Sequence, residues 1–406
     1  MCGICIEIRS IGVFVMTKVP GLTKNRVLII GGGIAGLSAS VRLAQAGLPV
    51  TLFEESTLGH GASTRNQGWL HSGGWFAKEN IHLASRCYKS LQQTIQCCPD
   101  CLEPQQQGMA YLFSNPDTDV SSWLTTWENV GIPFKKLPVE EIFEQIPRLD
   151  KSQIYDSYLL PDRSIRPEIL LNQIAITAEN LGVEIRTQTH ISGFLKENCS
   201  ITGVVTGSGE EIPGRAVVLA CGAAGTSLWS CSREFHVGEQ SEFTWVALKS
   251  HLVSVSPGLS NLPFCVVDRG GFNHIPHAAD SIFGNNRWKT VPYSTGPDVD
   301  PDEIEQTLQT IKQLIPTFSR KEHKINSWSG ISTQAMHVDQ IEPGQAPLPT
   351  VIDHSLESPS IQNLFSIFPG RATLWPQLAE ETRNTILEKF KLTDIPSEDP
   401  PWDIQE

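Results

Sequence analysis

The sequence contains no apolar run that approaches the ~20 residues of a transmembrane helix, so it predicts no integral membrane segment. It also has no excess of basic residues. Its 31 Lys and Arg face 44 Asp and Glu, and the net charge of −13 argues against a nucleic-acid partner and against anionic membranes. The apolar patch 11–16 is too short for a secretory signal and follows Glu7 and Arg9. We therefore expect a cytoplasmic protein, with residues 1–24 as an N-terminal extension and Met16 as a candidate start.

Ten cysteines are present, yet a disulfide framework is not expected where no secretory signal is found. Two pairs have C-x-x-C spacing, Cys2/Cys5 and Cys98/Cys101, and the second lies beside Cys97. Together they could hold zinc or an iron–sulfur cluster. We favour unligated thiols, because one pair lies in the extension and the other follows a predicted helix. The sequence thus predicts no metal site and leaves the role of the Cys97–Cys101 cluster open.

A glycine motif follows the apolar stretch 27–30 and precedes a helix-like stretch. Gly31, Gly33 and Gly36 have the G-x-G-x-x-G spacing of a dinucleotide-binding turn. A second apolar stretch ends at Glu54, about 20 residues further on, where a ribose-binding carboxylate belongs. The first glycine permits the tight turn, the second lets the backbone approach a pyrophosphate, and the third lets helix and strand pack closely. These residues predict a dinucleotide site.

With 406 residues, the chain is long enough for two lobes. Apolar periodicity predicts helices over 78–98, 167–181 and 376–391, buried strands at 183–186 and 216–220, and antiparallel sheet over 240–330. We expect an α/β fold: a Rossmann-like nucleotide-binding domain assembled from discontinuous segments, and a second α+β domain built on an antiparallel sheet. The expected boundaries are 25–90, 155–235 and 331–392 for the first domain, 91–154 and 236–330 for the second, and 393–406 for a loose tail.

Three further segments, with the glycine motif, resemble the FAD-dependent oxidoreductases of the D-amino-acid oxidase superfamily, which includes glycine oxidases. Segment 61–74 is similar to the stretch that leads from the pyrophosphate to the flavin ring in glycerol-3-phosphate dehydrogenases and L-2-hydroxyglutarate oxidases; we call it the flavin segment. The other two are 217–225 and 370–380. The resemblance implies FAD as cofactor, and a second domain that binds substrate. The implied cofactor-binding residues are Gly31, Gly33, Ile34, Ala35, Gly36, Glu54, Ser63, Thr64, Arg65, Asn66, Gly68, Ile191, Gly222, Gly370, Arg371, Ala372 and Thr373.

Two departures from these relatives bear on the substrate. D-amino-acid oxidases carry an arginine in a late strand, where this chain has 328–334 with no arginine. The glycerol-3-phosphate dehydrogenases have an arginine in the closing helix, where this chain has Pro376. A free amino acid and a phosphorylated triol are both put in doubt.

Three residues are the candidate catalytic groups. His71, in the flavin segment, suits the role of a base for an alcohol substrate. Arg269 could bind an anionic substrate group, and His274 and His277 follow it as further candidates. Arg371, before the last predicted helix, could stabilise negative charge on a reduced flavin together with the helix start.

The expected function is therefore removal of a hydride from a CH–OH or CH–NH centre of a small molecule, with oxygen or an electron carrier as final acceptor. A flavoprotein without turnover, such as an electron-transfer subunit, is the alternative. A third possibility is an enzyme that binds NAD in place of FAD. The substrate, the choice between oxidase and dehydrogenase, covalent flavin attachment and the oligomeric state stay open.

Overall fold

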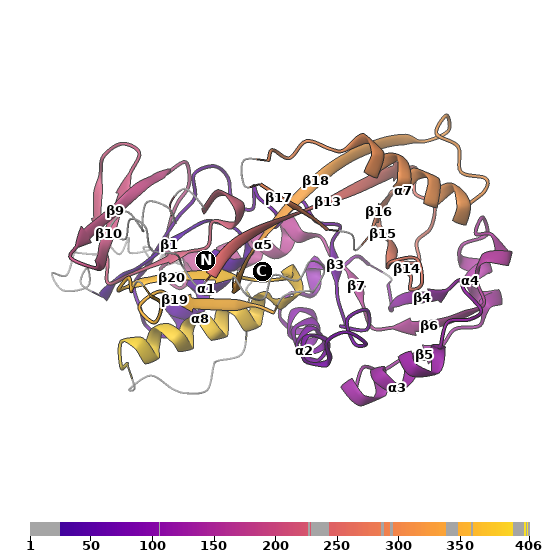
Figure 1. The fold of residues 1–406 in the computed structure, drawn as a ribbon, viewed down its shortest axis with the longest axis horizontal. Helices are drawn as coiled ribbons and strands as arrows, with labels where there is room; N and C mark the ends of the chain where they lie inside the picture. Colours follow the sequence, from indigo (N-terminus) through magenta and orange to yellow (C-terminus); the bar gives the residue numbers. More distant parts are fainter. Residues whose placement is uncertain are drawn as a thin grey trace, which may run out of the picture.

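The computed structural model describes residues 25–104, 106–225, 228, 243–285, 288–292, 295–337, 348–358, 360–392, 402 and 404. Two lobes lie side by side (Figure 1). The first is built on a six-stranded sheet of order β19-β20-β12-β1-β2-β8. Its strands are β1 (Val27–Ile30), β2 (Val50–Phe53), β8 (Glu184–Arg186), β12 (Ala216–Leu219), β19 (Thr350–Asp353) and β20 (Leu364–Phe368). Only the β19–β20 pair in this sheet is antiparallel, so the predicted Rossmann-like arrangement is confirmed.

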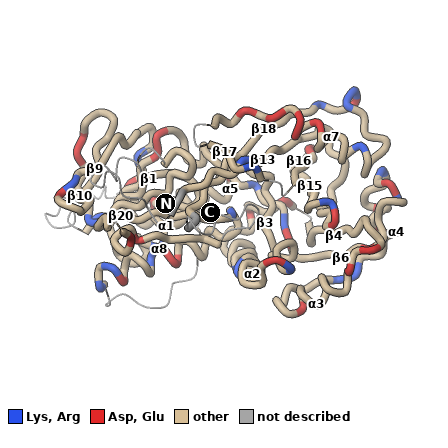
Figure 2. Tube along the Cα trace, in the orientation of Figure 1, with Lys and Arg blue, Asp and Glu red and all other residues tan. Residues whose placement is uncertain are grey.

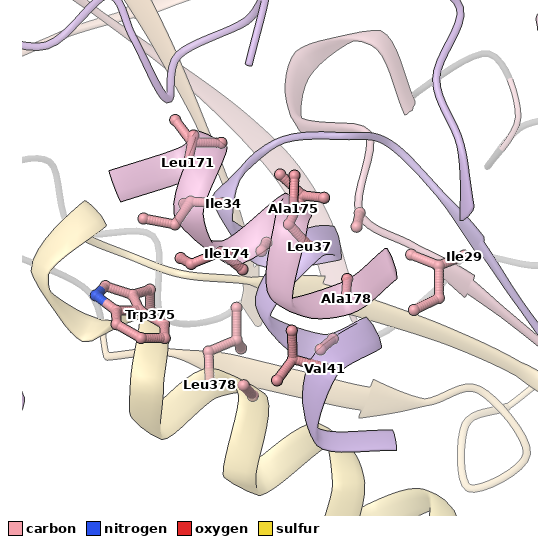
Figure 3. Packing of buried hydrophobic residues seen from close by; sticks show 14 of the residues in the cluster. Ile29, Ile34, Leu37, Val41, Leu171, Ile174, Ala175, Ala178, Trp375 and Leu378 are labelled. Atoms are coloured by element: carbon pink, nitrogen blue, oxygen red, sulfur yellow. The ribbon is translucent and has the colours of Figure 1, made fainter. Parts of the chain in front are cut away.

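Three helices cover one face of this sheet. Helix α1 (Ile34–Gln45) packs between α5 (Pro167–Asn180) and α8 (Trp375–Lys389), as Figure 3 shows. Leu37 and Val41 of α1 meet Ile174 of α5 and Leu378 of α8 in one buried cluster. Each such side chain contributes roughly 1.5–3 kcal/mol through removal from water. This packing fixes the start of α1 against the ends of β1 and β2.

The second lobe is built on a nine-stranded sheet, which is antiparallel except for the β4–β14 pair. Two 14-residue strands, β13 (Phe243–Ser256) and β18 (Lys324–His337), pair along their whole length and reach toward the first lobe (Figure 1). The other strands are β4 (Met109–Phe113), β5 (Lys135–Lys136), β6 (Asp156–Leu160), β14 (Phe264–Val266), β15 (Phe272–His277), β16 (Asp280–Gly284) and β17 (Lys289–Val291). The predicted antiparallel sheet over 240–330 is confirmed for β13 to β18, and β4, β5 and β6 extend that sheet from outside the predicted range.

The remaining elements connect or flank the two sheets. They are β3 (Trp69–Leu70), which pairs with β7 (Arg163–Ser164), the sheet of β9 (Ile191–Glu197), β10 (Ser200–Thr206) and β11 (Glu211–Pro213), the helices α2 (Ile81–Cys97), α3 (Val120–Val130), α4 (Val139–Gln145) and α7 (Pro301–Leu314), and the short 3-10 turns η2 (Pro99–Cys101), η3 (Lys151–Gln153), η4 (Gly222–Gly225) and η6 (Ala372–Leu374).

The structure differs from the sequence expectations in three places. Helix α7 interrupts the range predicted as sheet; Asp300 caps it, and Thr307, Leu308, Ile311 and Leu314 are buried at helical spacing. Strand β6, placed by the expected boundaries in the first domain, pairs with β4 in the second sheet. The tail is not loose at Trp402, which is buried against Trp375 with ring centroids 4.6 Å apart.

Charges of both signs are interspersed along both lobes (Figure 2). None of the described helices is both long and apolar enough to cross a membrane. The described ranges also contain no group of three or more His, Cys, Asp or Glu arranged to hold a metal ion.

Candidate functional site

The glycine turn lies between β1 and α1, and its geometry requires the residue type. Gly31 has φ +115°, and a Cβ there would lie 2.5 Å from the carbonyl oxygen of Ala220. A Cβ on Gly36 would lie 2.0 Å from the carbonyl oxygen of Gly31. Gly33 caps α1 with extended backbone, the Ile34 N–H donates to the Ser63 hydroxyl at 2.9 Å, and Gly33, Ile34 and Ala35 line a cavity at this end of the helix. The glycine roles expected for Gly31 and Gly36 match this geometry.

Glu54 directly follows β2 and lines the same cavity. Its carboxylate accepts hydrogen bonds from the backbone N–H of Gly32 at 2.8 Å and of Ser56 at 2.9 Å. The two bonds fix the carboxylate beside the glycine turn, where it retains lone pairs for further donors.

Two connected cavities form one elongated site. The first, about 370 Å³, lies over the glycine turn, and the second, about 120 Å³, lies between the lobes. They share the lining residues Ile34, Ala62, Ser63, Arg65, Ser332 and Pro369. Of the expected cofactor residues, the cavities are lined by Gly31, Gly33, Ile34, Ala35, Glu54, Ser63, Arg65, Asn66, Ile191, Gly222, Gly370, Arg371, Ala372 and Thr373.

Gly36, Thr64 and Gly68 do not line either cavity. Gly36 allows the close approach of α1 described above. The Thr64 hydroxyl donates to the carbonyl oxygen of Gly59 at 2.7 Å, which shapes the loop. Gly68 has φ +74°, and a Cβ there would lie 2.3 Å from the carbonyl oxygen of Ile165. These three residues support the site's backbone.

The flavin segment is held in place by its own side chains and by β18. Asn66 donates to the carbonyl oxygen of Ser63 and accepts from the N–H of Gly68, both at 2.8 Å. The Arg65 Nε–H donates to the carbonyl oxygen of Ser329 at 3.2 Å, and the Trp328 indole N–H donates to the carbonyl oxygen of Arg65 at 3.1 Å. The late strand without an arginine thus anchors this segment.

His71 is buried and lines the second cavity. Its ring stacks on Trp69, with centroids 4.1 Å apart and planes 28° apart, and also contacts Phe76. Neither ring nitrogen bonds to a described residue, and its backbone N–H donates to the Thr373 hydroxyl at 3.1 Å. Burial, and then the nearby Arg371 charge, hold the pKa of His71 well below its usual range. The imidazole is therefore neutral at pH 7 and able to accept a proton.

Arg371 faces the same cavity from the turn before η6. Its guanidinium lies between the rings of Phe76 and Trp288, 4.9 Å from each centroid. It forms no hydrogen bond or ion pair with any residue in the described part of the chain. Burial lowers the pKa of Arg371 to about 10, so it stays charged at neutral pH. An unpaired guanidinium here has donors free for an anionic or carbonyl-bearing ligand.

The second lobe contributes residues that the sequence analysis did not identify. Ser250 of β13, Asn285 after β16 and Ser332 of β18 line the second cavity together with Trp288. No local motif marks them, because their position depends on strand pairing far along the chain. Asp162, beside the flavin segment, was missed for the same reason.

The other candidate residues lie elsewhere. Arg269 lines a separate cavity of about 340 Å³ beside α7, and it donates to the Ser114 hydroxyl and to side-chain oxygens of two glutamines. His274 is buried, bonds to Leu262 and Ser281, and has a pKa lowered to about 3, mainly by burial. His277 bridges Glu103 and the carbonyl oxygen of Gln67. The structure does not bring these three together with His71.

The cysteine cluster is buried beneath the first lobe rather than displayed. Cys97, Cys98 and Cys101 are each less than a tenth exposed. The Cys98 thiol donates to the side-chain oxygen of Gln173 on α5. The three thiols are therefore not presented to a partner, although Pro99 and Asp100 between them are exposed.

Known proteins resemble this chain in sequence and in fold. The family described as "DAO: FAD dependent oxidoreductase" matches residues 26–356. Anaerobic glycerol-3-phosphate dehydrogenase subunit A1 of Haloferax volcanii is 26% identical over 395 residues, which are 90% of this chain and 64% of that protein; this chain thus spans less than two thirds of that relative's length. Glycine oxidase of Pseudomonas aeruginosa is 26% identical over 318 residues, 76% of this chain and 82% of that protein. The crystal structure of L-proline dehydrogenase from P. horikoshii superposes with a TM-score of 0.71 at 20% identity, covering 93% of this chain and 97% of that one.

Proposed function

We propose, from the premise that the chain belongs to the FAD-dependent oxidoreductase family, that it is an enzyme that oxidises a CH–OH or CH–NH centre of a small molecule. When bound, FAD supplies a hydride acceptor at its N5 atom. The observation that carries the proposal is the elongated site. It joins a dinucleotide turn at one end to a neutral histidine and an unpaired arginine at the other.

The described residues fit FAD at both ends. The glycines at 31 and 33 and the start of α1 line the first cavity and would receive the pyrophosphate, and the turn that forms this end of the site requires glycine at 31 because a Cβ there would collide with the backbone of Ala220. Glu54 would accept the ribose hydroxyls. The flavin segment and the turn 370–373 line the second cavity together with Ser250, Asn285 and Trp288 of the second lobe, and they would enclose the ring system.

The chain's own groups have distinct roles in this proposal. His71 accepts the proton that an alcohol substrate must lose, since its imidazole is neutral. Arg371, with the backbone of the turn 370–373 that lines the second cavity, would stabilise negative charge on a bound ring system. Aromatic walls at Trp69 and Trp288 exclude water from the same space.

Arg269 has no place in this step as proposed, because it lies outside the cavity that holds His71. The cysteine cluster gives the alternative of an electron-transfer subunit no support, since its three thiols are buried. A small-molecule substrate, with oxygen or an electron carrier as final acceptor, is therefore the partner set we propose. The negative net charge supports the prediction that nucleic acid is not a partner, and cytoplasmic location stays a prediction.

A substrate panel under anaerobic conditions tests the proposal. Glycine, L-proline, other amino acids, 2-hydroxy acids and glycerol 3-phosphate are mixed in turn with FAD-loaded protein, and loss of the flavin's visible absorbance is followed. We expect at least one class to bleach the flavin, and peroxide on return of air would identify an oxidase. Bound FAD that no member of an extended panel of alcohols and amines reduces would contradict the enzyme proposal.

A further inference from the structure

Asp162 is a fully buried carboxylate in the turn between β6 and β7. Its Oδ1 atom accepts from the Trp69 indole N–H at 2.7 Å, from the Ser72 backbone N–H at 3.0 Å and from the Tyr111 hydroxyl at 3.3 Å. Its Oδ2 atom accepts from the Ser72 hydroxyl. Every contact is therefore a donor directed at the carboxylate, as the ionised form requires.

Ser72 connects the carboxylate to the next turn of the flavin segment. Its hydroxyl donates to Asp162, and its oxygen accepts from the Gly74 backbone N–H at 3.2 Å. Burial raises the pKa of the Asp162 carboxyl, and the hydrogen bonds from Ser72, Trp69 and Tyr111 oppose that rise. A carboxylate without these bonds would be very costly in this position, so the network is interdependent.

Two of these bonds act on either side of His71. Trp69 and Ser72 flank the histidine in the flavin segment, and β7, which follows Asp162, pairs with β3 through Trp69 and Ser164. The His71 ring has no hydrogen bond to a described residue at either nitrogen, so its orientation depends on stacking. The ring on which it stacks is Trp69, and within the described residues the indole N–H of Trp69 bonds to Asp162 alone.

We propose that Asp162 is the positioning residue for His71 and acts through the indole of Trp69. The carboxylate holds the indole N–H, the indole plane sets the imidazole plane, and the imidazole faces the second cavity. The consequence for catalysis rests on the proposed proton-accepting role of His71. The positioning itself does not.

The test measures the position of the imidazole directly. Protein labelled with ¹³C at histidine Cε1 gives one ¹H–¹³C signal per histidine, and His71→Gln assigns the signal of His71. The ring current of the Trp69 indole shifts this signal. In Asp162→Ala the indole loses its acceptor, and we expect the His71 signal to move or split. In Asp162→Asn the retained Oδ1 can still accept from the indole, so we expect the signal close to its wild-type place.

Tyr111→Phe is the matched control, because it removes one donor from the same carboxylate and leaves the indole bond intact. Its His71 signal should not move. If Asp162→Ala does not fold, Trp69→Phe replaces the indole with a phenyl ring that has no N–H to bond to Asp162. A phenyl ring has its own ring current, so line width is measured there, and we expect broadening from a ring with more than one orientation.

A wild-type His71 signal in folded Asp162→Ala, or a sharp single signal in Trp69→Phe, would overturn the proposal. So would an Asp162→Asn signal displaced as far as that of the alanine variant, because charge rather than the indole bond would then matter. Anaerobic reduction of the flavin by a substrate from the panel separates the positioning of His71 by Asp162 from the proposed role of His71 as a base. A displaced signal with an unchanged reduction rate supports the positioning and refutes the role of His71 in proton transfer.

Discussion

Gly36→Ala tests whether the close approach of α1 to the glycine turn is what makes the dinucleotide site. The added Cβ would lie 2.0 Å from the carbonyl oxygen of Gly31, and real Cβ contacts are essentially never under 3.0 Å. The helix start must therefore shift by at least about 1 Å away from the turn. Gly36 is inside α1 and has no positive φ, so the effect comes from contact rather than from backbone strain.

Two opposing contributions set the expected change in the free energy of unfolding. Overpacking costs roughly 1–3 kcal/mol, and alanine in place of glycine in a helix returns up to about 1 kcal/mol. We expect the free energy of unfolding of the apoprotein to fall by up to about 2 kcal/mol. The FAD affinity should fall more. Each N–H bond lost to the pyrophosphate is worth about 1.5–3 kcal/mol, or roughly 10- to 150-fold in Kd.

Urea unfolding of the apoprotein and titration with FAD, followed by flavin fluorescence, give the two quantities. Gly193→Ala is the control, because it lies in β9, where a Cβ would meet nothing within 4 Å. It should leave the FAD affinity unchanged and raise the free energy of unfolding by no more than about 1 kcal/mol. A Gly36→Ala protein with wild-type stability and wild-type FAD affinity would refute the steric argument.

Three further predictions concern groups within and outside the site. His71→Gln should slow flavin reduction by an alcohol substrate at least tenfold while FAD stays bound. Because the pKa of His71 is lowered in the wild type, the wild-type reduction rate should stay flat as the pH falls to 6.5 and decline only below that pH. A decline centred above pH 6.5 in stopped flow would contradict the lowered pKa. His274 has a pKa of about 3 in the folded protein, below its value in the unfolded chain, so the unfolded state binds one more proton as the pH falls. The free energy of unfolding should therefore fall by up to about 1.4 kcal/mol per pH unit between pH 6.5 and 3. Urea unfolding of His274→Gln should show a shallower dependence on pH, and a slope equal to that of the wild type would refute this. Trp402→Ala should lower the free energy of unfolding by about 3 kcal/mol, because the ring packs on Trp375 and lies 3.7 Å from the Arg42 guanidinium; unchanged thermal unfolding would show that this contact does not form.

The parts predictable from sequence are those set by neighbouring residues. The turn at Gly31 and Gly36 and the carboxylate at Glu54 sit within one strand–helix–strand unit, so spacing alone places them. The flavin segment is similar, since Asn66 bonds to residues only two and three positions away. Arg371 was found because it directly precedes a helix start.

The parts not predictable depend on contacts between distant segments. Asp162 is marked by no motif, and its importance comes from Trp69 and Ser72, about 90 residues away. Asn285 enters the site only because β16 ends there. Arg269 was the opposite case: its residue type suited an anion site, yet the fold turns it toward α7.

Direct determination of FAD in the purified protein tests the central claim. The protein is denatured, and the released flavin is identified and quantified against the chain. The account predicts noncovalent or covalently held FAD equimolar with the chain, or full uptake when FAD is added to the apoprotein. A colourless protein that does not bind added FAD would contradict it.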